Sequence, residues 1–209
     1  MKKIFFSVLA VTAMLFTACN SNSKKKAEQQ SMNSMKKDTG QHAIAKEDKA
    51  VKAVAVSFTN VDARAAASIK EIVDHYLHIK TSLTNDNGNE AANGGKAMAE
   101  AIRKLDKSLL TAEQKKLFDA IEESLQEDAE HIGKNADKIR HQREHFATMS
   151  EAMYSLIKAF GAGIPIYHDH CPMYNEGKGA MWLSEISEIK NPYYGTGMPT
   201  CGSVEEVIK

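Results

Sequence analysis

The feature that most constrains the fold of this chain is a helical repeat of apolar residues between positions 61 and 160. Within this region apolar side chains recur mostly at steps of three and four residues, which places them on one face of an α-helix. The first stretch shows the pattern in Ile69, Val73 and Tyr76. Four helices are expected, at about residues 62–84, 90–109, 111–133 and 136–160.

Short connections between these helices predict that neighbours run antiparallel. Asn85 to Gly88 form a turn signal, and Thr111 with Gln114 forms a capping box that opens the third helix. Gly94 and Gly95 are expected to weaken the start of the second helix. The predicted fold class is all-α: an up-down four-helix bundle over residues 58–160.

Asp128 is expected on the inward side of the third helix and Arg143 at the margin of the fourth. A lone charge in a helical bundle is costly, so we expect these two side chains to pair. That pair would stabilise the bundle and would have no catalytic role.

Residues 161–209 have a different character, because they contain all four prolines and seven of the twelve glycines. Such a density of helix breakers excludes another long helix. We expect a loop-rich C-terminal cap packed on the bundle. A short strand is predicted at Ile164–Tyr167 and a short final helix from Ser203.

The N-terminus has the features of an export signal. Lys2 and Lys3 precede an apolar run, Ile4–Phe16, that is too short to cross a hydrocarbon core of roughly 30 Å as a helix. The run ends in Phe16-Thr17-Ala18-Cys19, which resembles a lipobox with phenylalanine at the position where leucine is usual. We therefore expect residues 1–18 to be a signal peptide and Cys19 to carry the lipid that anchors the protein.

Residues 19–57 lack apolar periodicity and are rich in polar side chains, so they are expected to form a lipidated, disordered tether. Asn20, rather than an aspartate, follows Cys19. This favours an outer-membrane lipoprotein that faces the periplasm.

The cap gathers soft metal ligands. If Cys19 is lipidated, Cys171 and Cys201 are the two cysteines that remain. Thiolates and thioethers favour Cu(I), and imidazole suits copper and zinc alike. The candidate copper ligands are Cys171, Met173, Met198, Cys201, His168 and His170.

A disulfide between Cys171 and Cys201 is the alternative, because paired cysteines in an oxidising compartment usually form one. Such a bridge would contribute about 3–4 kcal/mol by closing a loop. The protein would then be an envelope interaction module with a stapled cap. A site that binds Cu(I) when reduced and releases it when oxidised would satisfy both interpretations.

Other patterns argue against an enzyme and against nucleic acid. His75 with His78, and His141 with His145, are interpreted as solvated helix faces, because neither pair lies in a zinc-protease or di-iron pattern. Nothing in the sequence supplies an orienting group for Cys171 as a nucleophile. Lys and Arg number 27 and Asp and Glu 27, so no basic footprint for nucleic acid exists.

Several short motifs of the cap resemble the signature of a domain family of unknown function. They are Cys171-Pro172-Met173, Trp182-Leu183-Ser184, Asn191-Pro192-Tyr193-Tyr194-Gly195, Met198 and Cys201-Gly202. The resemblance covers about residues 65–209. Tyr174 departs from it, since a small residue is expected there.

Members of the resembled family are lipoproteins of Gram-negative bacteria. The same domain is also found at the C-terminus of periplasmic adaptor subunits of copper/silver efflux pumps. The resemblance implies heavy-metal efflux as the context, with ligands at Cys171, Met173, Met198 and Cys201. His168 and His170 are not part of the family pattern. The expected function is therefore Cu(I) sequestration, or transfer to a heavy-metal efflux adaptor.

Overall fold

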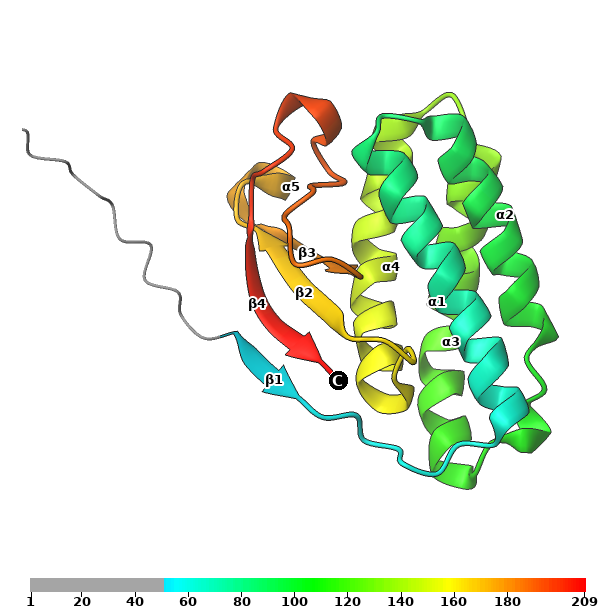
Figure 1. Cartoon of the computed structure of the whole chain (residues 1–209). Coiled ribbons are helices and arrows are strands. Elements are labelled where there is room, and N and C mark those ends of the chain that lie inside the picture. Colours follow the sequence, from blue (N-terminus) through cyan, green and yellow to red (C-terminus); the bar gives the residue numbers. More distant parts are fainter. Residues whose placement is uncertain (1–50) are drawn as a thin grey trace, which may run out of the picture. The chain divides into compact units, whose positions relative to one another are not determined.

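The computed structural model describes residues 51–209 (Figure 1). The predicted signal peptide, the lipidated Cys19 and the tether as far as residue 50 lie outside these residues. Between residues 51 and 209, no helix combines the length and the apolar character needed to cross a membrane.

The four predicted helices are confirmed. They are α1 Ala63–Thr84, α2 Gly88–Lys104, α3 Ala112–Lys134 and α4 Ile139–Phe160. Each packs against the next along the chain, and α4 also contacts α1 (Figure 1). The second helix ends earlier than predicted, and Lys107–Leu109 form a separate 3₁₀ turn, η1.

Local capping explains where the helices begin. The Asp62 side chain accepts a hydrogen bond from the Arg64 amide at α1, and Asn87 accepts one from the Glu90 amide at α2. The capping box of Thr111 at α3 is formed in both directions with Gln114. These side chains satisfy amides that have no partner inside the helix.

Gly95 has a packing role rather than the weakening role expected from its propensity. It lies inside α2, where an added Cβ would come within 2.7 Å of both the Ala129 carbonyl oxygen and the Gly133 amide nitrogen of α3. Backbone atoms cannot move aside as a flexible side chain can. The missing side chain therefore allows α2 and α3 to approach closely.

Replacing Gly95 with alanine is expected to lower the free energy of unfolding by about 1–3 kcal/mol, because overpacking outweighs the gain of about 1 kcal/mol in helix propensity. Urea denaturation followed by circular dichroism measures the change. Gly197→Ala is a matched control, since nothing lies within 4 Å of its added Cβ. A Gly95→Ala protein as stable as the native chain would show that the two helices separate without cost.

The all-α prediction is wrong, because strands of the cap and one strand that precedes the helices form a sheet. Its strands are β1 Lys52–Val54, β2 Ile166–Cys171, β3 Ala180–Ser184 and β4 Ser203–Ile208. Their order is β1-β4-β2-β3, with β1 parallel to β4 and the other pairs antiparallel. The molecule is thus a helical bundle with a mixed four-stranded sheet packed beside it (Figure 1).

Two segments differ specifically from expectation. The C-terminal residues from Ser203 form β4 instead of a helix, and their Val204, Val207 and Ile208 are β-branched residues suited to a strand. Strand β1 lies in the segment expected to be the end of the tether. The predicted strand at Ile164–Tyr167 corresponds to β2, which begins two residues later and extends to Cys171.

The sheet and the helices share one core. The buried Trp182 and Leu183 of β3 belong to the same apolar cluster as Phe146 of α4. The Tyr76 hydroxyl lies 2.8 Å from Ser150 Oγ and accepts a hydrogen bond from the Leu183 amide at 2.9 Å. This buried hydroxyl joins α1, α4 and β3, so the cap is bonded to the bundle as well as packed on it.

The predicted pair of Asp128 with Arg143 is wrong. Arg143 donates to the Pro192 carbonyl at 2.8 Å and to the Leu83 carbonyl at 2.9 Å, and it pairs with Asp86 at 2.5 Å. Asp86 also accepts hydrogen bonds from Thr196, and these together with Arg143 lower its pKa to about 2. Arg143 therefore fastens the β3–β4 connection to the bundle.

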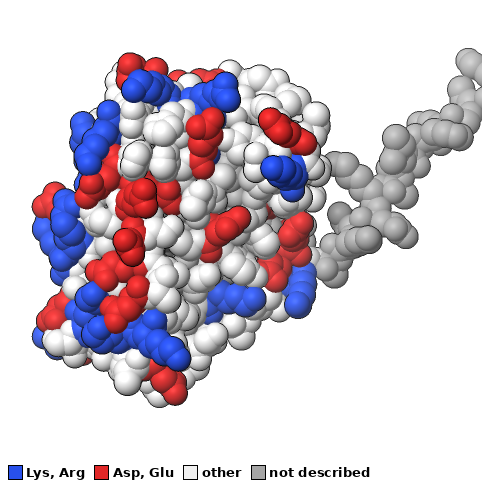
Figure 2. Space-filling model, turned by 180° about the vertical axis from the view of Figure 1, so that it is seen from behind, with Lys and Arg blue, Asp and Glu red and all other residues white. Residues whose placement is uncertain are grey.

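Charged side chains of both signs lie side by side on the surface of residues 51–209. On the face shown in Figure 2, Lys and Arg side chains alternate with Asp and Glu side chains, and no large area carries one sign. Many of the pairs are one helical turn apart, as in Lys70 with Asp74 and Lys134 with Glu130. Exposed pairs of this kind contribute little stability.

Candidate functional site

Cys171 and Cys201 meet in the cap, with 3.0 Å between their Sγ atoms. Both are free thiols, although thirty residues of chain separate them. Cys171 is fully buried, whereas Cys201 is half-buried. The pair is therefore reached from solvent on the side of Cys201.

Strand pairing brings the two cysteines together. Cys171 ends β2, and its neighbour His170 pairs with Ser203 at the start of β4. Gly202 lies between Cys201 and that strand with a φ of +143°. An added Cβ there would lie 2.7 Å from the Trp182 ring, so glycine lets the chain pass close to β2 and β3.

Asn191 holds the segment that carries Cys201. Its side-chain amide donates to the Cys201 carbonyl at 2.6 Å, and its side-chain oxygen accepts from the amides of Tyr193 and Tyr194. Its own amide donates to the Pro199 carbonyl at 2.8 Å. The side chain is fully buried, so these bonds fix the loop in one conformation.

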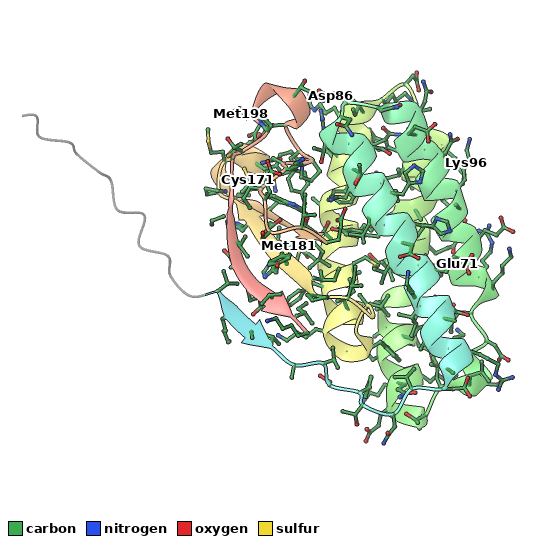
Figure 3. The ribbon with its side chains drawn as sticks, viewed as in Figure 1. Glu71, Asp86, Lys96, Cys171, Met181 and Met198 are labelled. Atoms are coloured by element: carbon green, nitrogen blue, oxygen red, sulfur yellow. The ribbon has the colours of Figure 1, made fainter. Side chains whose placement is uncertain are left out.

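The two methionines of the predicted site differ in their surroundings. Met198 is half-buried and accepts the Cys201 amide at 3.3 Å in a tight turn, which ties its backbone to that cysteine. Met173 is 54% exposed, and its carbonyl accepts the Tyr194 hydroxyl at 2.9 Å. Figure 3 places Cys171 and Met198 in the same part of the cap.

Mutual contact changes the acidity of the thiols. The pKa of Cys201 is raised, first by its contact with the Cys171 thiol and then by loss of solvent. The pKa of Tyr194 is also raised, by desolvation and by both cysteines. A metal ion bound by both sulfurs must displace their protons.

His168 and His170 contact carboxylates of β4. The Nδ1 atom of His168 lies 3.8 Å from Glu206 and 3.9 Å from Glu205, and Nδ1 of His170 lies 3.6 Å from Glu205. Burial lowers the pKa of His168 despite these carboxylates. Within residues 51–209, neither histidine belongs to a cluster of three or more His, Cys, Asp or Glu side chains that could share a metal ion.

Asp169, between those histidines, is a buried acid that the sequence did not single out. It is fully buried, and neither carboxylate oxygen has a hydrogen-bond partner among the described residues. Burial raises its pKa to about 8, with Lys80 acting in the opposite direction. Trp182, its partner in the β2–β3 ladder, likewise has an indole nitrogen without a partner in residues 51–209.

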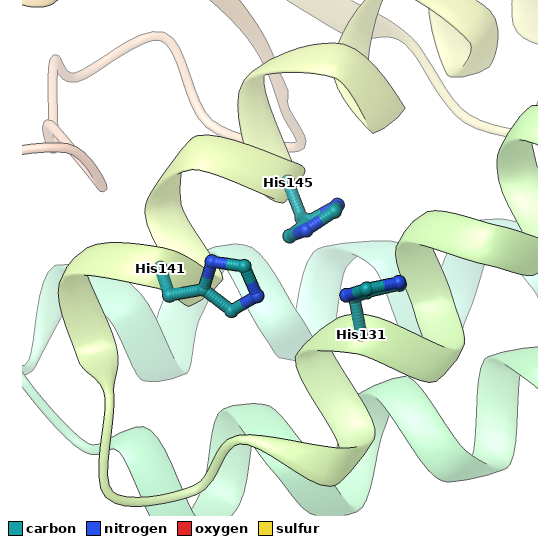
Figure 4. A group of neighbouring side chains, drawn as sticks. All are labelled: His131, His141 and His145. Atoms are coloured by element: carbon teal, nitrogen blue, oxygen red, sulfur yellow. The ribbon is translucent and has the colours of Figure 1, made fainter.

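A second cluster consists of His131, His141 and His145, where α3 faces α4 (Figure 4). The sequence interpretation assigned His141 and His145 to a solvated helix face and overlooked His131. A usable signal was the short connection between the two helices. In an antiparallel hairpin, residues equally far from the turn lie level with each other, which matches His131 with His141 and Asp128 with His145.

Comparisons with known proteins found a match to a family model, but no activity. Residues 72–164 match the model of a family described as a protein of unknown function (DUF3347). The match runs from the middle of α1 to just beyond α4, so it contains part of α1, all of α2, α3 and α4, and none of the strands. No curated protein matches the chain. No solved structure matches it either.

Proposed function

We propose that this protein is a non-enzymatic envelope lipoprotein that binds Cu(I) at Cys171 and Cys201. It would sequester the ion or pass it to a heavy-metal efflux adaptor. The observation that carries this proposal is the meeting of two free thiols, 3.0 Å apart, from distant parts of the chain. Thiolates are the ligands that Cu(I) prefers.

The thiol pair needs only a small adjustment to hold an ion. Metal–thiolate bonds of about 2.3 Å, the length typical of zinc, separate two sulfurs by about 3.7–4.6 Å. The Cys201 side chain can supply this movement because it is half-buried. Met198, three residues before Cys201, is the thioether best placed to complete the site. The exposed Met173 would control access of the ion to it.

The location rests on the sequence. The lipobox-like segment ending at Cys19 would anchor the protein in the outer membrane, facing the periplasm. This compartment is oxidising, so the state of the thiols decides whether they can bind metal. The resemblance to domains of copper/silver efflux adaptors supplies the proposed partner.

A second candidate function is an interaction module with a stapled cap, and it is favoured by the same short distance. A disulfide needs about 2.05 Å between the sulfurs, which a rotation of Cys201 could provide. An external oxidant would remove two electrons, and two protons would be released. The oxidised pair would offer no thiolate to Cu(I).

Anaerobic titration of the reduced full chain in detergent with Cu(I), against a chromogenic chelator, tests the proposal. We expect one tightly bound ion per chain. Cys201→Ser should weaken Cu(I) binding about 100-fold or more, because it removes a thiolate ligand. Met198→Leu should weaken it about tenfold, because the thioether is a weaker ligand than the thiolate. Met181→Leu is the matched control, because Met181 pairs with His170 in the β2–β3 ladder and successive strand side chains point to opposite faces of the sheet, so Met181 and Cys171 lie on different faces.

Thiol counting on protein taken directly from the envelope separates the two candidates. Free thiols together with Cys201-dependent Cu(I) binding support the metal function. A disulfide in the envelope, with reduced protein that binds Cu(I) no better than Cys201→Ser, would leave the stapled interaction module. Circular dichroism of each variant verifies that the helices remain.

A further inference from the structure

We propose that His131, His141 and His145 form a second metal site, for a divalent first-row transition-metal ion such as Zn(II) or Cu(II). His131 comes from α3, while His141 and His145 lie one turn apart on α4 (Figure 4). One nitrogen from each ring lies within 4.8 Å of the others. Within residues 51–209 this is the one such group of His, Cys, Asp or Glu side chains.

The present ring arrangement is close to a binding geometry. The rings of His131 and His145 are stacked with centroids 4.2 Å apart, and His141 meets His145 edge-on at 4.5 Å. Three imidazoles around a tetrahedral ion, with bonds of about 2.0–2.1 Å, place their nitrogens about 3.3 Å apart. Rotation of the half-exposed His131 and His141 side chains would close this difference.

Asp128 provides an independent indication of a metal site. Its Oδ1 lies 2.8 Å from Nδ1 of His145, and its side chain is only 6% exposed. The other oxygen, Oδ2, has no partner among the described residues. A neutral His145 that donates from Nδ1 to this carboxylate keeps Nε2 free as a lone-pair donor. A carboxylate that orients a ligating histidine in this way is characteristic of protein metal sites.

Hydrogen bonds of a buried side chain hold the backbone next to the cluster. Next to His141, the buried Gln142 side chain donates to the Ile132 carbonyl at 3.1 Å and to the Gly88 carbonyl at 2.9 Å. These bonds tie α4 to the end of α3 and to the start of α2. The three ligands therefore start from fixed positions, so little backbone ordering opposes binding.

The ligand set and the surrounding charge determine which metal ions the site prefers. Three imidazoles without a thiolate suit Zn(II), Ni(II) and Cu(II), among which Cu(II) binds most tightly. Glu144 lies 3.6 Å from the His141 ring and Glu127 lies 4.0 Å from the His131 ring, so the site favours a cation. Because the rings are partly exposed, a fourth position is open to water or to an incoming ligand.

Binding of Zn(II) and Co(II) to the full chain carrying Cys201→Ser tests this site apart from the thiol pair. We expect one ion per chain. We also expect a visible Co(II) spectrum without the near-ultraviolet band of cobalt–thiolate bonds. His131→Ala, His141→Ala and His145→Ala should each weaken Zn(II) binding about 100-fold, whereas His78→Ala, on α1, should leave the affinity unchanged.

Asp128→Asn examines the positioning role. The expected result is Zn(II) binding weakened about tenfold, with a metal-free protein whose helical content and melting temperature are no lower than before. Zn(II) affinity that is equal in the native chain and in the His131→Ala, His145→Ala and His78→Ala variants would overturn the proposal. A thiolate band in the cobalt spectrum would do so as well. Neither result affects Cu(I) binding at Cys171 and Cys201, so the two proposals fail separately.

Discussion

Replacing Asp169 with asparagine is expected to raise the free energy of unfolding at pH 8 by about 3–5 kcal/mol and to flatten its pH dependence. Burial raises the pKa of this carboxyl to about 8, far above the value of 3.8 for an exposed aspartate. Between these two values the folded protein holds a proton that the unfolded chain has released. Stability therefore falls as the pH rises from about 4 to about 8.

The surroundings of Asp169 explain why ionisation is costly. Lys80 is the cation that favours ionisation of Asp169, but its ammonium group is bonded to Glu185 at 2.8 Å. The buried Tyr76 hydroxyl is already bonded to Ser150 and to the Leu183 amide. Asparagine keeps the shape of the side chain and carries no charge, so it avoids the penalty.

Urea denaturation at pH 5 and pH 8 measures the effect. The difference between the native chain and Asp169→Asn isolates this carboxyl from the other ionisable groups of the protein. Asp74→Asn is the exposed control, because Asp74 lies at the surface and its ion pair within residues 51–209 is with Lys70. A native chain whose stability changes with pH as that of Asp169→Asn does would show that Asp169 is ionised in the folded protein.

Trp182→Ala is expected to lower the free energy of unfolding by about 3–5 kcal/mol, the usual cost of removing a large buried aromatic. Trp182 is fully buried and meets Tyr193 edge-on, with ring centroids 6.0 Å apart. Trp182→Phe should cost only about 1–2 kcal/mol, since the indole nitrogen makes no hydrogen bond within residues 51–209.

The same experiment reports on the thiols. Because Gly202 packs against the Trp182 ring, Trp182→Ala should also speed alkylation of Cys201 in the folded protein. Chemical denaturation and timed labelling provide the two measurements. A loss of less than 1 kcal/mol with unchanged labelling would mean that the cap unfolds separately from the helices.

The helices were predictable because their information is local. The spacing of Ile69, Val73 and Tyr76 alone identifies the buried side of α1, and all three are buried. The capping box at Thr111 depends on residues within one turn. Each of these signals requires knowledge of only a few neighbouring positions.

The sheet was not predictable in the same way. The strand β2 carries His168, Asp169 and His170, which obscure any alternation of apolar and polar residues. The strand β1 is only three residues long, and its partner β4 lies at the other end of the domain. A pattern read along the sequence contains no trace of such a distant pairing.

In the candidate sites, too, local features could be predicted from the sequence and tertiary contacts could not. Cys171 and Cys201 could be selected by residue type, and the structure brings them together. His131 requires the register between α3 and α4, which no single helix contains. The prediction for Arg143 failed because its partners, Asp86 and Pro192, lie in connections whose path depends on the tertiary fold.

The position of β4 inside the sheet imposes an order of assembly in time. A chain that emerges from its N-terminus presents β1 and the four helices early, yet β1 has no neighbour until Glu206 to Ile208 arrive. The helices can associate during this interval, because their contacts are local in sequence. Cys171 is made thirty residues before Cys201, so its thiol is present before its partner. The two thiols can therefore approach each other only after the helices and the strands β2 and β3 have been made.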